Sequence, residues 1–376
     1  MKGNPEMTNT TEPSPRTRFV YDEWIESVGV PIHTGFYISD LRTVELGWWE
    51  ERGCQTGFVQ LEGQEGVSET RITEIPPGET LPAYSIGLDE VVYVLKGNGA
   101  TLVEDGDGHS DSFEWNTRSM FLVPAHANRR FRNLSGESAR LVHYTYLPLA
   151  LSVVTDPDFF LKNPYRRAGG IGADNETAFG DAANIAGGEG YRWINGQRGK
   201  GVAYWYGRFY PDMSAWDRLD SNSERGAGSK TVRIQFAGTD MSAHMSVFAP
   251  QTYKKGHRHG PGRAILIPKG EGYSLMWKEG EEKVVVRWQE GSMFVPPNRW
   301  FHQHFNIGLE PARYLAIHPP IQLNGYTEKV VNANDQVEYV NEDPSIRAMF
   351  EEDLAQRSLT SLMPDEAYTD PSFSWS

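Results

Sequence analysis

The chain has 376 residues, 39% of them hydrophobic and 23% charged, which indicates a globular protein rather than a disordered one. Its formal net charge of −14 comes without a cluster of Lys or Arg, which argues against nucleic acid or an anionic membrane as a partner. No apolar run reaches the ~18 residues that a membrane helix requires. The lone Cys54 excludes an internal disulfide, so we expect a cytoplasmic protein.

The chain order predicts five segments. Residues 1–19 are polar, lack the apolar stretch of a secretory signal, and are expected to form a flexible leader. Short runs of Val, Phe, Tyr and Trp bounded by Gly and Pro predict β-strands in residues 20–150 and again in residues 191–330. The glycine-rich residues 151–190 connect these two regions, and residues 331–376 are expected to form a helical tail.

The tail contains a typical helix start. Asp343 precedes Pro344 and Ser345, and the helix expected after them carries apolar residues on one face. These residues are Ile346, Met349, Phe350 and Leu354. We expect this face to pack on a barrel or on a second subunit. Together with the acidic composition and the extended N-terminus, the helix favours a homo-oligomer.

An internal repeat relates the two β regions at a constant offset of 173 residues. Three matches share this offset without a gap: Lys96-Gly97-Asn98-Gly99 with Lys269-Gly270-Glu271-Gly272, Ser119-Met120-Phe121 with Ser292-Met293-Phe294, and Asn133 with Asn306. Each copy has the length and strand content of a small antiparallel barrel or jelly roll. We therefore predict a mostly β protein with two barrels.

The second copy contains residues with a recognisable spacing: His257-Arg258-His259, Gly270, Gly291, Pro297, His302 and Asn306. This set resembles the two sequence motifs of the cupin superfamily, and the resemblance extends over residues 70–145 and 240–320. It implies two cupin barrels, each a double-stranded β-helix of the jelly-roll kind. It also implies one divalent metal on His257, His259 and His302.

Strand geometry gives a physical reason for the histidine pattern. Successive side chains on a strand point to opposite faces, so His257 and His259 project to the same side, and His302 meets them from a neighbouring strand. Neutral imidazoles are suitable ligands for Fe(II), Zn, Ni, Cu and Mn. Three of them leave coordination positions open for a substrate and, with iron, for O2.

Three positions of the second copy depart from the cupin motifs. The motif glutamate, often a fourth metal ligand, is Arg263, and two motif glycines are Gln251 and Arg299. Loss of the glutamate predicts a site of histidines alone. On a regular strand Arg263 faces the same interior as His259, where its guanidinium is suited to hold a carboxylate or phenolate with two hydrogen bonds. An interior salt bridge is the alternative role for this side chain.

The first copy lacks the histidines. Tyr84, Ile86 and Arg129 stand at the positions that match the three predicted ligands, and Glu90 matches Arg263. A single carboxylate does not hold a catalytic metal, so we expect this barrel to be structural, or to serve as a binding or dimerisation surface.

A narrower resemblance concerns the histidine segments themselves. The HRH sequence at 257–259, an arginine in place of the glutamate, and the FHQHFN sequence at 301–306 are similar to segments of gentisate 1,2-dioxygenases and their salicylate- and hydroxynaphthoate-cleaving relatives. The resemblance implies Fe(II) on the three histidines and Arg263 at the substrate carboxylate. It also implies His304 as a residue beside the metal that handles a proton. In those relatives the working site usually lies in the N-terminal barrel, whereas here it is C-terminal.

The function that we expect is that of a non-haem Fe(II) dioxygenase. It would use O2 to cleave a C–C bond in a small, anionic, hydroxylated acid, probable substrates being aromatic. A non-oxidative lyase, isomerase or decarboxylase that uses Zn, Mn or Ni is the first alternative. A small-ligand-binding cupin without catalysis is the second. Metal identity and oxygen uptake distinguish the first two.

Overall fold

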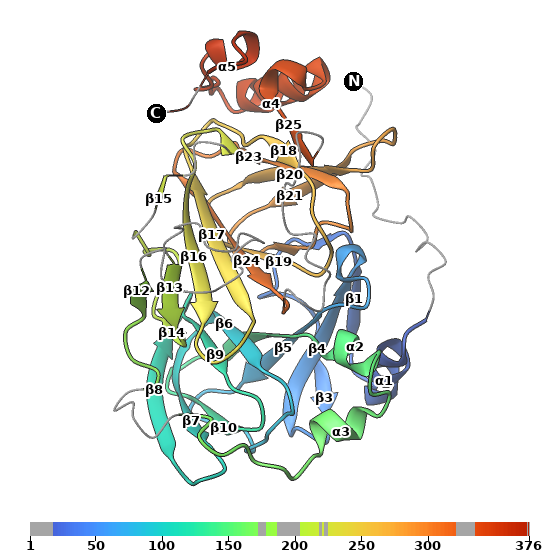
Figure 1. Cartoon of the computed structure of the whole chain (residues 1–376), viewed down its shortest axis with the longest axis vertical. Helices are drawn as coiled ribbons and strands as arrows, with labels where there is room; N and C mark the ends of the chain where they lie inside the picture. Colours follow the sequence, from blue (N-terminus) through green and yellow to red (C-terminus); the bar gives the residue numbers. More distant parts are fainter. Residues whose placement is uncertain are drawn as a thin grey trace.

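The computed structural model describes residues 18–171, 178–185, 204–217, 220–221, 225–320, 335–373 and 375. They form two β-barrels, each made of a large and a small sheet, and Figure 1 shows the second barrel above the first. The predicted mostly β fold, with two jelly-roll barrels and a C-terminal helix, is confirmed. Most of the predicted leader and part of the predicted connector lie outside the described residues.

The first barrel is built from runs of Val, Ile, Leu and Phe whose side chains alternate between buried and exposed faces, as in β7, or are buried on both faces, as in β6. Its large sheet contains β1 (Ile32–Gly35), β3 (Gly47–Trp49), β4 (Cys54–Leu61), β5 (Glu69–Ile75), β6 (Glu90–Lys96), β9 (Met120–Val123) and β11 (Ala139–Thr145). Its small sheet contains β7 (Asn98–Glu104), β8 (Ser110–Asn116) and β10 (Asn128–Asn133).

The second barrel repeats this arrangement. Its large sheet contains β12 (Ala183–Ile185), β13 (Tyr204–Gly207), β15 (Asp220–Ser221), β16 (Lys230–Phe236), β17 (Ser242–Phe248), β19 (Ala264–Lys269), β22 (Met293–Phe294) and β24 (Ala312–His318). Its small sheet contains β18 (Gly256–His257), β20 (Gly272–Trp277), β21 (Val284–Trp288), β23 (Phe301–Asn306) and β25 (Gln336–Val337).

The offset found in the sequence is also present in the structure. Strands β5, β10 and β11 begin and end 173 residues before β17, β23 and β24. The turns repeat as well. Gln251, at a motif glycine position, has φ +55°, and its counterpart Gly78 has φ +72°; Arg299 has φ +61° and its counterpart His126 has φ +62°. The backbone therefore retains the left-handed turns even where glycine, which adopts them without strain, has been replaced.

Each barrel is completed by a two-residue strand from the other region of the chain. Strand β2 (Tyr37–Ile38) pairs with β22 of the second barrel, and β14 (Phe209–Tyr210) pairs with β9 of the first. Since β9 and β22 occupy equivalent places, the exchange is reciprocal. Apolar residues of both large sheets, among them Ile72 and Leu315, also share one core between the barrels. The predicted boundaries 20–150 and 191–330 remain predictions, to which this exchange adds an interlocking contact.

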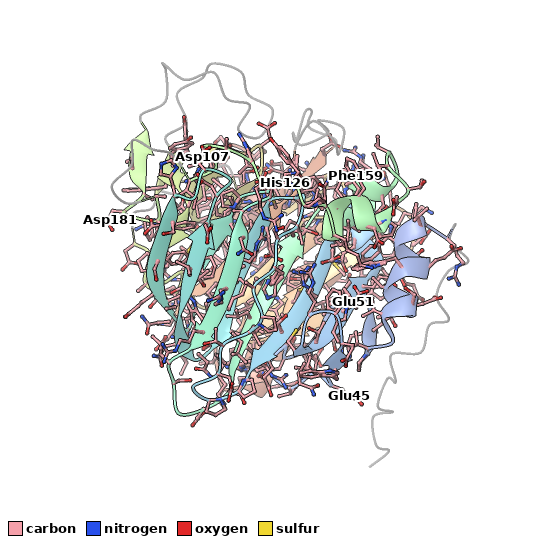
Figure 2. The ribbon with its side chains drawn as sticks, turned by 90° about the horizontal axis from the view of Figure 1, so that it is seen from below. Glu45, Glu51, Asp107, His126, Phe159 and Asp181 are labelled. Carbon is pink, nitrogen blue, oxygen red and sulfur yellow. The ribbon has the colours of Figure 1, made fainter. Side chains whose placement is uncertain are left out.

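Three helices cover one side of the first barrel, where the sequence had suggested strands or a connector. They are α1 (Val20–Val28), α2 (Leu147–Leu151) and α3 (Pro157–Leu161), and their apolar residues pack on Trp49 and Phe58. Figure 2, seen from below, shows Phe159 of α3 and His126 at this end of the barrel.

The expected C-terminal helix is α4 (Pro344–Gln356), and the Asp343 carboxylate accepts the backbone N–H of Ser345 at 3.0 Å. Ile346, Phe350 and Leu354 pack on the second barrel, followed by the short α5 (Glu366–Thr369) (Figure 1). Two 3-10 turns, η1 (Glu62–Gln64) and η4 (Tyr339–Asn341), complete the described elements. No helix in the described part of the chain is both long and apolar enough to cross a membrane.

Candidate metal centre

The structure brings the three predicted ligands together inside the second barrel. His257 on β18 lies directly opposite His302 on β23, and one ligand atom from each of His257, His259 and His302 lies within 4.8 Å of the others. The backbone N–H of Arg299 donates to the carbonyl of His259 at 2.8 Å, so the turn before β23 holds the HXH segment in place. A group of three imidazoles at this spacing can hold a metal ion.

Burial keeps these imidazoles neutral, as metal ligands must be. His302 is 1% exposed, and burial lowers its pKa to about 3. Burial also lowers the pKa of His257 and of His259 well below the usual histidine range, and the nearby charges of Arg225 and Arg263 add to this effect. The donor set therefore fits a divalent transition metal without any loss of protons at neutral pH.

Backbone carbonyls orient two of the rings. His259 Nδ1 lies 2.7 Å from the carbonyl oxygen of Gly260, and His302 Nδ1 lies 3.3 Å from that of Trp300. A carbonyl only accepts, so Nδ1 carries the proton in each ring and Nε2 keeps its lone pair for a metal. His257 differs, since its Nδ1 contacts the guanidinium of Arg225, which can only donate. Binding a metal at Nε2 of His257 therefore requires Arg225 to release Nδ1.

His304 lies beside the three histidines but outside the group. Its Nδ1 is 2.7 Å from Ser274 Oγ, which in turn accepts the indole N–H of Trp288 at 3.0 Å. Ser274 therefore donates its proton to His304, and the neutral ring carries its own proton on Nε2. The imidazole lies 5.6 Å from the ring of His302. This placement matches the expectation of a proton-handling neighbour rather than a ligand, and the role itself stays a prediction.

Arg263 is 5% exposed and enters the same buried region, since its charge acts on His259, His244 and His318. Burial lowers its pKa to about 10. The preceding Gly262 has φ +81°, and its carbonyl accepts the hydroxyl of Tyr144 from the first barrel at 2.6 Å. The predicted position of Arg263 inside the barrel therefore holds, although an irregular turn rather than a regular strand leads to it.

Sequence reasoning missed a buried lysine next to this region. Lys254 is fully buried, and its ammonium donates to Ser246 Oγ at 3.1 Å and to Tyr314 Oη at 3.0 Å. Within the described chain it has no carboxylate partner. The Tyr314 ring lies 4.6 Å from that of His304. Burial alone would raise the pKa of Tyr314, but the charges of Lys254 and Arg225 lower it below the usual tyrosine value.

Two further histidines complete this polar interior. His244 Nδ1 lies 2.8 Å from His318 Nε2, on neighbouring strands of the large sheet. The signal that could have identified them is the alternation of polar residues at 242, 244 and 246 on β17, which places Ser242, His244 and Ser246 on one face. In an isolated sequence the same pattern is typical of a solvent-exposed strand face.

The C-terminal segment adjoins the centre. Asp335 binds Arg258 at 3.0 Å and Arg299 at 2.5 Å, and the side-chain oxygen of Gln336 accepts from Arg225 at 2.6 Å. Strand β25 also pairs with β18, which carries His257. The segment predicted as a helical tail thus supports the loops that hold the histidines.

The first barrel has an ionic network where the second has its histidines. Glu90 accepts hydrogen bonds from Arg129 at 2.7 Å, from the Tyr84 hydroxyl at 3.2 Å and from Arg71, and it lies 3.2 Å from His143 Nδ1. These cations lower the pKa of the Glu90 carboxyl well below its usual value, although burial opposes them.

Ile86, which replaces His259, is packed in an apolar cluster of the first barrel. Among the described residues, the other group with metal-ligand spacing is Asp105, Asp107 and His109 in an exposed turn. There, the Asp105 carboxylate accepts the turn's own backbone N–H groups. The expectation that the first barrel lacks a comparable histidine site agrees with these contacts.

No protein-family model and no curated protein matches the chain. Its fold is similar to solved structures of oxalate decarboxylase. The Lactobacillus farciminis enzyme in its formate complex is 15% identical with a TM-score of 0.47, over 76% of this chain and 87% of that one. A deletion mutant of the Bacillus subtilis enzyme is 13% identical with a TM-score of 0.46, over 76% of each chain. Likeness at this level concerns the arrangement of strands and does not identify a reaction.

Proposed function

We propose that this protein is a metal-dependent enzyme, with one divalent metal on His257, His259 and His302 of the second barrel. The observation that carries the proposal is the group of three neutral, buried imidazoles with ligand atoms within 4.8 Å of one another. We further propose Fe(II) as the metal and oxidative C–C cleavage of a small hydroxylated acid as the reaction, with O2 as the second substrate.

Charge around the centre supports an anionic substrate. The ligands are neutral, so a divalent ion keeps its full charge, and Lys254 and Arg263 add two buried cations to the same interior. Lys254 is bound by hydroxyl groups rather than by a carboxylate. Buried positive charge is costly unless it is compensated, so binding of a carboxylate or phenolate is favoured here.

The side chains divide the remaining tasks. A bound metal supplies Lewis acidity, and iron additionally supplies redox chemistry with O2. Arg263 holds the substrate carboxylate with its planar guanidinium. His304, oriented by Ser274, presents its Nε2 proton to the bound substrate. The apolar and aromatic surroundings exclude water, which strengthens each of these electrostatic contacts.

The Lys254–Tyr314 pair favours a second candidate function, a non-oxidative lyase, isomerase or decarboxylase that uses Zn, Mn or Ni. A tyrosine whose pKa is lowered by an adjacent ammonium can give and take a proton near neutral pH more readily than an ordinary phenol. Such chemistry requires a Lewis acid and a proton carrier but no oxygen.

Metal content and oxygen uptake distinguish the two candidates. The purified protein is analysed for metals, then loaded anaerobically with Fe(II) and mixed with a panel of hydroxybenzoates and aliphatic hydroxy acids in an oxygen electrode. Uptake that depends on substrate, with about one iron per chain, supports the dioxygenase. Tightly bound Zn, Mn or Ni, substrate turnover and no uptake after iron loading support the non-oxidative enzyme. A protein that holds no divalent metal contradicts both.

A further inference from the structure

The first barrel contains a hollow of its own. Its walls include Trp49, Arg52, Cys54, Leu81, Tyr84 and His143, and its empty space, counted with the open mouth, is about 310 Å³. Tyr84 is the counterpart of His257, so the hollow lies where the second barrel has its histidines. In Figure 2, Glu51 marks the turn after β3 that carries the neighbouring Arg52.

Arg52 contributes a cation to this hollow that lacks a carboxylate partner in the described part of the chain. Its Cζ lies 4.3 Å from the ring centroid of Tyr84 and 5.4 Å from that of Trp49, so the two aromatic side chains hold the guanidinium in place. Burial lowers its pKa, and the charges of Arg71 and Arg129 add to this effect. A guanidinium held in this way is prepared to bind an anion without further ordering.

The deeper charges of the barrel do not compensate Arg52. Arg71 binds both Glu69 and Glu90, and Arg129 binds Glu90 at 2.7 Å. These two arginines and two glutamates balance one another, which leaves the charge of Arg52 in excess. One bound monoanion restores neutrality inside the barrel, and a second would introduce repulsion.

His143 supplies a second polar contact. It is 1% exposed, lines the hollow, and its Nε2 has no hydrogen-bond partner. Its Nδ1 faces the Glu90 carboxylate at 3.2 Å, which favours the proton on Nδ1 and leaves a lone pair on Nε2. A buried acceptor of this kind fits a hydroxyl group, because an unsatisfied buried nitrogen costs free energy.

We propose that the first barrel is a metal-free binding site for a small hydroxy acid, whose carboxylate pairs with Arg52 and whose hydroxyl donates to His143. The site is separate from the metal centre and goes beyond the proposed reaction. The size of the hollow restricts the ligand to a few heavy atoms, and Leu81 and Trp49 contact its carbon chain.

Indole N–H signals of the full-length protein test this site, because tryptophans report on both barrels. Glycolate is the probe, Trp49 is assigned with Trp49→Phe, and Trp300 serves as reporter of the second barrel. We expect a saturable shift of the Trp49 signal, with weaker binding of acetate, which lacks the hydroxyl, and none of neutral glycolamide. Arg52→Gln should raise the dissociation constant at least tenfold, or ~1.4 kcal/mol.

Matched variants keep the outcome interpretable. Arg132→Gln removes an exposed cation from the same barrel and should leave the glycolate affinity unchanged. Arg52→Lys keeps the charge without the planar fork and should show an intermediate affinity. The proposal is overturned if glycolate shifts Trp300 but not Trp49, or if Arg52→Gln, with an otherwise unchanged spectrum, binds it as tightly as the natural protein.

Discussion

The two barrels share a backbone and differ in how they handle buried charge. In the first, Glu90 neutralises two arginines, and no metal is needed to stabilise the interior. In the second, the equivalent position is Arg263 and the ligand positions are histidines, so the interior gains cations and loses the carboxylate. A repeat thus became either a self-neutralised core or a centre that favours a metal and an anion, through changes at four positions.

The largest expected difference between the barrels is in metal binding. His302→Ala should reduce the metal content to almost none, because two histidines do not hold a divalent ion in competition with water. Tyr84→Phe changes the counterpart of His257 and should leave the metal content as it was. Elemental analysis of the dialysed proteins measures both. Equal metal loss in the two variants would mean that the barrels share one site or that neither is the one proposed.

The second largest effect concerns stability of the first barrel. Glu90→Gln leaves Arg71 and Arg129 buried without their shared counter-charge and should lower the free energy of unfolding by about 3–5 kcal/mol. Urea unfolding measures the change. Glu114→Gln, on an exposed position of β8, is the control and should stay within about 0.5 kcal/mol. A similar small effect of both variants would show that the ionic network does not stabilise the barrel.

The corresponding change in the second barrel should affect binding more than stability. Arg263→Gln removes a charged donor, so the KM for an anionic substrate should rise roughly 10- to 100-fold, equivalent to ~1.5–3 kcal/mol for a hydrogen bond to a charged group. Metal content should remain unchanged, since Arg263 is not a ligand. Steady-state kinetics with the substrate found in the oxygen-electrode panel measures this. An unchanged KM would assign Arg263 to the interior salt bridge instead.

The sequence predicted the parts of this comparison that depend on spacing. The offset of 173 residues identified both barrels, and the HXH pair with His302 identified three side chains that do lie together. The exchanged strands β2 and β14 escaped prediction because two residues carry no periodicity. Lys254 and Tyr314 lie 60 residues apart and meet only through the packing of the barrel. Residues 335–342 looked like a tail because a short β25 and several ion pairs leave no pattern.

The smallest expected effect is at the helix that covers the second barrel alone. Asp343 caps α4 by accepting the N–H of Ser345, and it also binds Lys283 at 2.9 Å. Asp343→Ala should lower the free energy of unfolding by about 1 kcal/mol. Hydrogen bonds to Ser345 and Lys283 lower the pKa of Asp343 to about 2 in the folded protein, against a usual value of 3.8.

A carboxyl with a lowered folded-state pKa contributes its stability above the unfolded pKa and loses it as the pH falls through the folded one. The difference between the natural protein and Asp343→Ala should therefore be full above pH ~4 and shrink towards pH ~2. Unfolding curves at a series of pH values measure it, with Asp365→Ala, at an exposed carboxylate before α5, as the control. If the difference is instead independent of pH, the loss of Asp343 acts through helix propensity or packing rather than through its charge. In that case α4 is held on the second barrel by Ile346, Phe350 and Leu354 alone, and the tail depends on burial where the first barrel depends on ion pairs.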